Sequence, residues 1–119
     1  MFDANRRKYP RANYPCFLTM WQTNGSNETV LANTSNIGAG GLSVHLNEGI
    51  ALGIKVDIQL SFTNQSTPFK CQGTVVRSIK ESERYYNIGI QFEPLSELKF
   101  AFLDGKVSEL IELEKKGKS

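Results

Sequence analysis

The sequence predicts a mainly β fold, a six-stranded antiparallel β-barrel with a flexible N-terminal arm and a C-terminal α-helix. Six short β-rich segments follow one another, separated by turn-forming residues, which is typical of antiparallel barrels and sandwiches. After Pro94 the hydrophobic period changes from that of a strand to that of a helix. The 119 residues suffice for one domain with one core.

Residues 1–13 form the predicted arm, because they are polar and basic and show no helical periodicity. Pro10 lacks an amide hydrogen and disfavours the α conformation at Tyr9. Arg7 and Arg11 are therefore not a pair on one helical face. The formal net charge of the chain is only +2, and the arm carries a local excess of positive charge on an otherwise nearly neutral body. That distribution is not typical of a general nucleic-acid binder, so we expect no DNA or RNA partner.

The barrel is expected over residues 14–93. Its six predicted strands cover residues 14–21, 28–34, 41–46, 54–62, 69–79 and 85–92. Residues 54–62 show the clearest alternation of apolar and polar side chains, as in a strand with one buried face. Residues 33–42 combine small polar side chains with three glycines. We expect a sharp turn there, where the polar edge of a ligand can approach the backbone.

Residues 94–119 are expected to form the C-terminal helix and tail. Ser96 suits the N-cap position, and Glu97 complements the dipole of the first turn. An apolar stripe runs to about Lys116 and needs an apolar partner, most simply an open end of the barrel. Its members are Leu95, Leu98, Phe102, Leu103, Val107, Leu110, Ile111 and Leu113. Gly105 lies inside this helix and costs about 1 kcal/mol relative to Ala, so a kink there is an alternative.

The sequence contains no recognisable catalytic or metal-binding constellation. Nucleophile-elbow, P-loop and dinucleotide fingerprints are absent, and His45 is the only histidine. Cys16 and Cys71 lie far apart in apolar segments, so we expect buried, reduced thiols. With no run of ~18 apolar residues and no secretory signal, we expect a cytoplasmic protein that is not an enzyme.

The N-terminal arm and the segment at residues 33–42 both suit the binding of a compact anionic ligand. Arginines on the arm can bind guanine bidentately, stack on a base or pair with a phosphate. Asn33 and Ser35 offer an amide and a hydroxyl, and at Gly38 a side chain would obstruct a base or a phosphate. Taken separately, the two segments are more simply interpreted as a solvated basic tail and an ordinary hairpin turn. Arg77 is expected as a surface charge, with reach to the ligand edge as the alternative.

Taken together, these segments resemble the PilZ domain family. Arg7-Lys8-Tyr9-Pro10-Arg11 matches its R-x-x-x-R motif, and Asn33-Thr34-Ser35-Asn36-Ile37-Gly38 matches its (D/N)-x-S-x-x-G motif. The late strand at 85–92 and the helix after it are also similar to the family, so the resemblance covers the chain from Arg6 to about Leu113. It implies a stand-alone, single-domain receptor for the bacterial second messenger cyclic di-GMP.

The resemblance also implies a role for each motif residue. Arg7 and Arg11 would hold guanine bases and phosphates. Arg6, directly before the motif, implies two ligand molecules per chain, because a further cation can stack on or neutralise a second copy. No other cofactor is implied.

The second motif would form the fixed part of the site. Asn33 and Ser35 would contact a guanine edge or position the arm, and Gly38 would leave room. Asn33 stands where aspartate is common in the family. Its amide offers one acceptor oxygen plus a donor where a carboxylate offers two acceptors, which bears on affinity and on the pose of the base.

The expected mechanism is a switch in which cyclic di-GMP orders the arm on the barrel and a downstream protein reads the changed surface. One alternative is a PilZ-like adaptor that contacts proteins without binding nucleotide. Another is a small barrel for single-stranded nucleic acid, which would need more lysines and arginines on its strands. Motility, exopolysaccharide synthesis and virulence regulation are all compatible with the resemblance.

Overall fold

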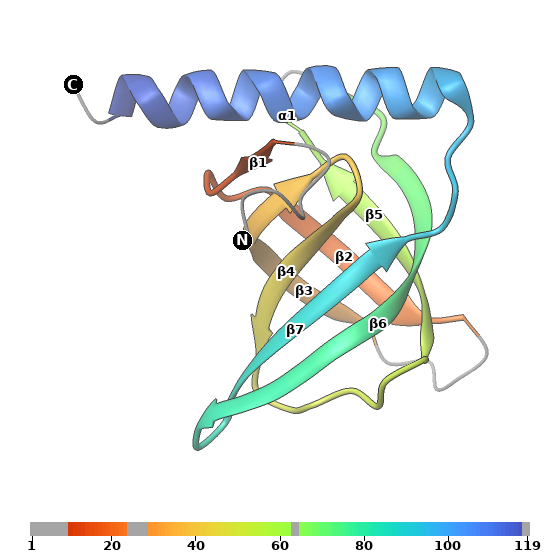
Figure 1. Cartoon of the computed structure of the whole chain (residues 1–119), viewed down its shortest axis with the longest axis vertical. Helices are drawn as coiled ribbons and strands as arrows, with labels where there is room; N and C mark the ends of the chain where they lie inside the picture. The colour runs from red at the N-terminus through yellow and green to blue at the C-terminus, as the bar shows by residue number, and fades with distance from the viewer. Residues whose placement is uncertain (1–9, 24–28, 63–64, 118–119) are drawn as a thin grey trace, which may run out of the picture.

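The computed structural model describes residues 10–23, 29–62 and 65–117. It confirms the predicted fold class, since six antiparallel strands form a closed barrel and one long helix lies across an end of it (Figure 1). A further short strand, β1, lies outside the barrel. The elements are β1 (Arg11–Ala12), β2 (Phe17–Gln22), β3 (Val30–Gly38), β4 (Gly41–Leu46), β5 (Lys55–Ser61), β6 (Phe69–Ser82), β7 (Tyr85–Phe92) and α1 (Glu97–Gly117).

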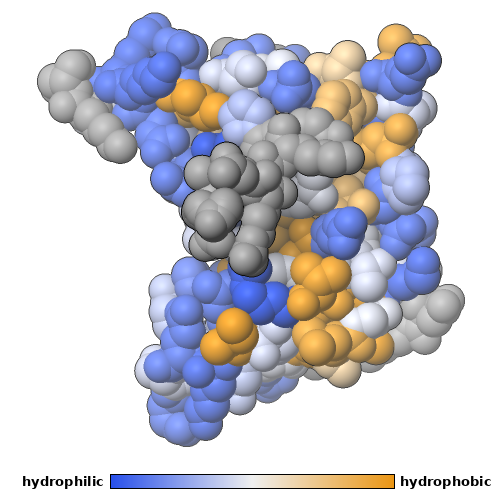
Figure 2. All heavy atoms as spheres, viewed as in Figure 1, coloured by the Kyte–Doolittle hydropathy of each residue, from blue (hydrophilic) through white to orange (hydrophobic). Residues whose placement is uncertain are grey.

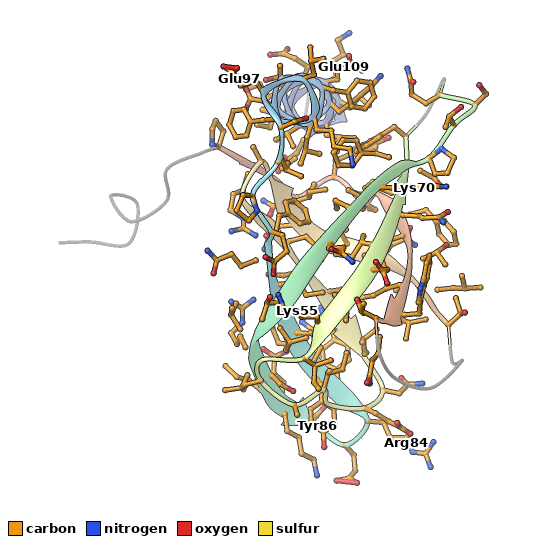
Figure 3. All side chains as sticks on the ribbon, turned by 90° about the vertical axis from the view of Figure 1, so that its right-hand side faces the viewer. Lys55, Lys70, Arg84, Tyr86, Glu97 and Glu109 are labelled. Atoms are coloured by element: carbon orange, nitrogen blue, oxygen red, sulfur yellow. The ribbon has the colours of Figure 1, made fainter. Side chains whose placement is uncertain are left out.

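The strands pair in the order β3-β2-β5-β6-β7-β4, and β4 pairs again with β3 to close the barrel. Closure satisfies the backbone groups that an open sheet would leave at its edges. The β6–β7 hairpin projects from the end opposite α1 and carries Arg84 and Tyr86, while Glu97 and Glu109 lie on the helix at the other end (Figure 3). The molecule therefore has a helix-covered end and an end without a helix.

Alternating strand residues fill the interior. The largest fully buried side chains are Leu18, Met20, Ile37, Leu42, Val44, Val56, Ile58, Leu60, Val75, Ile88, Leu103 and Val107. Leu103 and Val107 come from α1. With Leu110 they form the buried apolar stripe by which the helix closes the barrel. Phe102 lies at the edge of this stripe and stacks on Phe69 with ring centroids 5.7 Å apart.

The predicted stripe is correct for its centre and wrong for Leu98, whose side chain is 85% exposed. At 3.6 residues per turn, Leu98 lies about 140° around the helix from Leu103. It therefore points away from the face that covers the barrel. Burial along α1 follows this geometry rather than hydrophobicity alone.

The helix begins and continues as the sequence predicts. The hydroxyl of Ser96 accepts a hydrogen bond from the amide of Lys99 at 3.2 Å, which is the geometry of an N-cap. The alternative of a break at Gly105 is wrong, because α1 is continuous from Glu97 to Gly117. A Cβ atom added at Gly105 would meet nothing within 4 Å.

We expect a Gly105→Ala substitution to raise the free energy of unfolding by about 1 kcal/mol, because alanine restricts the unfolded chain and favours the helix. Urea denaturation of the variant and the wild type measures this difference. A destabilised variant would contradict a continuous, solvent-facing helix at this position.

The predicted sharp turn over residues 33–42 is confirmed only at Ala39 and Gly40, which separate β3 from β4; it is wrong for residues 33–38, since Asn33–Gly38 belong to β3. Asn, Ser and Gly favour turns locally, but this segment pairs with β2, β4 and β1 along its length. A β-bulge between Thr34 and Asn36 accommodates the extra residue. Pairing with three strands thus overrides the local preference.

Thr34 fixes the segment to the core. Its side chain is 3% exposed, and its hydroxyl oxygen accepts a hydrogen bond from the amide of Cys16 at 3.0 Å.

Cys16 and Cys71 are both buried and free, as expected. Burial raises the pKa of Cys16 to about 11 and that of Cys71 to about 12, so both remain protonated thiols at neutral pH.

Within the described ranges, no helix is long and apolar enough to span a membrane.

Candidate functional site

The structure places four of the six sequence-predicted site residues. Arg11 lies in β1, and Asn33, Ser35 and Gly38 lie in β3. Arg6 and Arg7 are outside the described residues. The register of β1 against β3 sets Arg11 opposite Gly38 and Ala12 opposite Ile37, so the two motifs meet through backbone pairing.

Gly38 is the contact point between the arm and the barrel. A Cβ atom added there would lie 2.8 Å from the carbonyl oxygen of Pro10 and 3.1 Å from Cγ of Arg11. Contacts below 3.0 Å require something to shift, and a backbone oxygen moves only with its chain. A side chain at Gly38 would therefore clash with the arm where β1 pairs with β3, and the approach of a base or a phosphate to this glycine stays a prediction.

The helix holds the arm from the other side. The backbone amide of Asn13 donates to Oε1 of Glu114 at 3.1 Å, and its Nδ2 donates to Oε2 at 3.2 Å. Figure 1 shows β1 between the barrel and α1. Arg11 thus sits in a segment fixed by β3 on one side and by α1 on the other.

Asn33 and Ser35 offer polar groups beside this segment. Asn33 is exposed, Ser35 is half-buried, and the buried Thr34 lies between them. Ser35 is the extra residue of the bulge, since Thr34 pairs with Val44 and Asn36 pairs with Ser43. The Oδ1 atom of Asn36 is buried and has no hydrogen-bond partner in the described part of the chain. This strand therefore carries side-chain groups that a polar ligand can use.

The sequence predicts Arg77 as a surface charge, but in the structure hydrogen bonds fix the position of its guanidinium. Its Nη2 donates to Oγ of Ser43 at 2.7 Å and to Oδ1 of Asn87 at 3.0 Å, and its Nε donates to the same Asn87 oxygen at 3.3 Å. A bulge between Val75 and Arg77 turns Arg77 outward, although its parity matches that of the buried Val75. An arginine at a position where the alternation of the strand predicts a buried apolar residue is the feature of the sequence that indicates this bulge.

His45 belongs to a structural network next to Arg77. Its ring stacks on Tyr85 at 4.5 Å between centroids, and its Nε2 lies 3.2 Å from Oε1 of Glu81. Asn87 connects this network to Arg77, because its Nδ2 donates to Oε2 of Glu81 at 3.3 Å. Stacking on Tyr85 and the contact with Glu81 account for the position of the His45 ring. Across the ranges that the structure describes, no group of three or more metal-ligating side chains comes together.

Comparison with known proteins identifies a family. A family model described as PilZ domain matches residues 5–105. No sequence among curated proteins matches significantly.

Several solved structures share the fold. The PilZ domain of YcgR from Escherichia coli, in a structure with c-di-GMP, is 18% identical, with 95% of this chain and 96% of that chain covered and a TM-score of 0.72. MotI/DgrA, the inhibitor of motility of Bacillus subtilis, is 15% identical, with 96% and 54% covered and a TM-score of 0.71. The K. pneumonia MrkH–c-di-GMP complex is 22% identical, with 96% and 55% covered and a TM-score of 0.70. This chain therefore spans about half the length of the MotI/DgrA and MrkH chains.

Proposed function

The chain belongs to the PilZ domain family, and from this premise we propose that it binds cyclic di-GMP between its N-terminal arm and the outer face of β3. The observation that carries the proposal is the pairing of β1 with β3, which sets Arg11 opposite Gly38. Arg7 precedes Arg11 by four residues and can lie at most about 14 Å from it. Both arginines thus have reach to the strand that carries Asn33 and Ser35.

The chemistry of these residues suits a cyclic dinucleotide of guanine. An arginine can donate to O6 and N7 of guanine bidentately or pair with a phosphate oxygen. The amide oxygen of Asn33 accepts from the N–H groups on the opposite edge of a guanine, and the hydroxyl of Ser35 can donate or accept. In this proposal the arm supplies positive charge and the strand supplies neutral hydrogen-bonding groups.

We propose that two ligand molecules bind per chain, with Arg6 contacting the second. A second copy brings two more phosphates, and a third arginine on the arm offsets part of their repulsion. The proposal is one of binding without catalysis, in keeping with the engagement of His45 by Tyr85 and Glu81.

The signal would pass from the arm to a protein partner. Asn13 and Glu114 join the arm to α1, so a ligand that orders the arm also alters the surface along the helix. A ligand shifts such an equilibrium only by its differential affinity for the two arm states. MotI/DgrA is described as an inhibitor of motility, and we propose that this chain likewise acts as a regulator through its protein partner.

Isothermal titration calorimetry with cyclic di-GMP tests the proposal. We expect binding at about two ligand molecules per chain, and an Arg7→Ala variant should bind about 10- to 100-fold more weakly, because one arginine contact is worth about 1–3 kcal/mol. Arg6→Ala should lower the stoichiometry toward one. Lys55→Ala is the control, since this exposed lysine of β5 pairs with Glu93 at 3.3 Å and should bind as the wild type does. Absence of heat at high micromolar ligand would refute nucleotide binding and favour an adaptor without a ligand.

A further inference from the structure

We propose that a cavity at the end of the barrel opposite α1 is the docking site for a segment of the downstream protein, an amphipathic helix that presents large apolar side chains beside basic ones. The inference rests on the proposed function only for the role of this partner, as the protein that reads the ligand. The cavity lies outside both sequence motifs, and we call it the barrel-mouth cavity.

The barrel-mouth cavity is formed where the strands end. Figure 1 shows the connection from β4 to β5 running along the end of the barrel that has no helix. Residues 47–50 of this connection line the cavity together with the adjoining ends of β2, β3, β4 and β5, and its volume is about 400 Å³. Ligand sites in proteins have volumes of about 300–1,000 Å³. The cavity is therefore large enough to accept apolar groups of side-chain size.

The floor of the cavity belongs to the hydrophobic core. Two of its side chains, Met20 and Val56, are each 1% exposed. The other apolar lining residues are partly buried and pack against the core; they are Val30, Ala32, Leu46 and Ile50. Insertion of an apolar group here removes its surface from water, which is the main favourable contribution to association.

The apolar surface continues beyond the cavity. Leu31 lines the cavity and is 66% exposed, and Trp21 beside it is half-buried. Figure 2 shows hydrophobic side chains gathered on the barrel toward the end that lacks a helix, whereas the helix is mostly hydrophilic. A small molecule inside the cavity would leave Leu31 in water, but a longer segment covers both. The extent of the apolar surface thus favours a protein partner.

The pairing of the strands favours a helix over an extended segment. Among the described strands, β2 pairs with β3 and β5, and β4 pairs with β3 and β7. An extended peptide therefore finds no open sheet edge at this end to which it could add as a strand. An amphipathic helix satisfies its own backbone and presents anchors at i, i+3, i+4 and i+7 to an apolar site.

The charge at the rim favours a basic segment. Of the described residues that line the cavity, Glu48 is the only one with a carboxylate, and no lysine or arginine is among them. Glu48 is exposed, whereas the neighbouring His45 is engaged by Glu81 at 3.2 Å. A basic residue next to the apolar anchors complements Glu48, and an acidic residue there is repelled.

Two synthetic peptides without tryptophan test the site. One is an amphipathic helix with leucine and phenylalanine on one face and lysine on the other, and the second has glutamate in place of every lysine. Trp21 lines the cavity and is the only tryptophan of the chain, so its fluorescence reports occupation. We expect a saturable change with the lysine peptide and about fivefold weaker binding of the glutamate peptide. The net charge of +2 by itself favours the glutamate peptide, so the opposite preference indicates binding at Glu48.

Three variants locate the binding. Ala32→Phe fills the cavity and should abolish the fluorescence change, and Leu31→Ala should weaken binding about tenfold. Glu48→Lys should reverse the preference between the two peptides. Glu112→Lys is the matched control, because it makes the same change of charge at an exposed position of α1, at the other end of the barrel. Thermal unfolding establishes that each variant is folded, and Leu31→Ala changes only an exposed side chain if Ala32→Phe is not.

The outcomes separate this inference from the proposed function. Absence of a saturable change with the lysine peptide, equal binding of both peptides, or wild-type binding by Leu31→Ala would overturn the docking site. If sedimentation shows that the wild type self-associates and Leu31→Ala does not, the occupant is a second copy and the assignment to a partner is wrong. The three variants should bind cyclic di-GMP as the wild type does. A wild type that binds the lysine peptide but not cyclic di-GMP would refute the proposed function and leave the docking site in place.

Discussion

A Gly38→Val variant should bind cyclic di-GMP roughly 100-fold more weakly than the wild type while the barrel remains folded. The first added carbon would already lie 2.8 Å from the carbonyl oxygen of Pro10, so β1 has to leave its place on β3. Displacement of β1 removes Arg11 from the site and, with it, the chain that carries Arg7. Loss of two arginine contacts at about 1–3 kcal/mol each accounts for an effect of this size. Valine suits a strand, which is why we expect β3 itself to persist.

Two measurements test the mechanism. Calorimetry gives the affinity, and hydrogen exchange of the unliganded protein reports the pairing of Arg11–Ala12 with β3. We expect faster exchange in β1 of the variant. If the affinity falls but exchange in β1 is unchanged, Gly38 serves to admit the ligand and not the arm. Gly105→Ala is the matched control for a glycine substitution, because it meets no neighbour within 4 Å and should leave the affinity unchanged.

The barrel could be predicted because its strands carry their own signals. The predicted segments 41–46 and 85–92 coincide with β4 and β7, where alternation is regular and turn residues stand at both ends. β6 continues to Ser82, three residues beyond its predicted end at 79. Its last residues are exposed and polar, and only pairing with β7 makes them a strand. Such pairing is not visible in local hydrophobicity.

The site was predicted as a set of residues but not as a geometry. The second motif was expected in a turn, yet its residues form a bulged strand, because β1, β2 and β4 all pair with it. β1 has two residues, too few for any periodicity. The orientation of Arg77 depends on a bulge and on Gly89, twelve residues later, where an added Cβ atom would lie 2.7 Å from Cζ of Arg77. These features arise from tertiary pairing, which a single sequence does not display.

The C-terminal helix connects the stability of the barrel with the position of the arm. Its buried face contributes Leu103, Val107 and Leu110 to the core, and its Glu114 accepts both hydrogen bonds from Asn13. Asn13 and Glu114 are separated by 101 residues, so the contact forms only after the barrel and the helix have come together. A change in the packing of α1 therefore reaches the arm directly.

We expect Leu103→Ala to lower the free energy of unfolding by about 2–5 kcal/mol, which is a large part of the roughly 5–15 kcal/mol that stabilises a domain. Leu103 is 0% exposed, and its truncation leaves a cavity where α1 meets the open end of the barrel. Urea denaturation measures the loss, and Leu98→Ala provides the matched control on the same helix. Leu98 is 85% exposed, so its removal loses little buried surface, and alanine is slightly the better helix former. Equal losses in the two variants would contradict the packing of α1 on the barrel, whereas a large loss confined to Leu103→Ala would locate the helix contribution in the buried stripe.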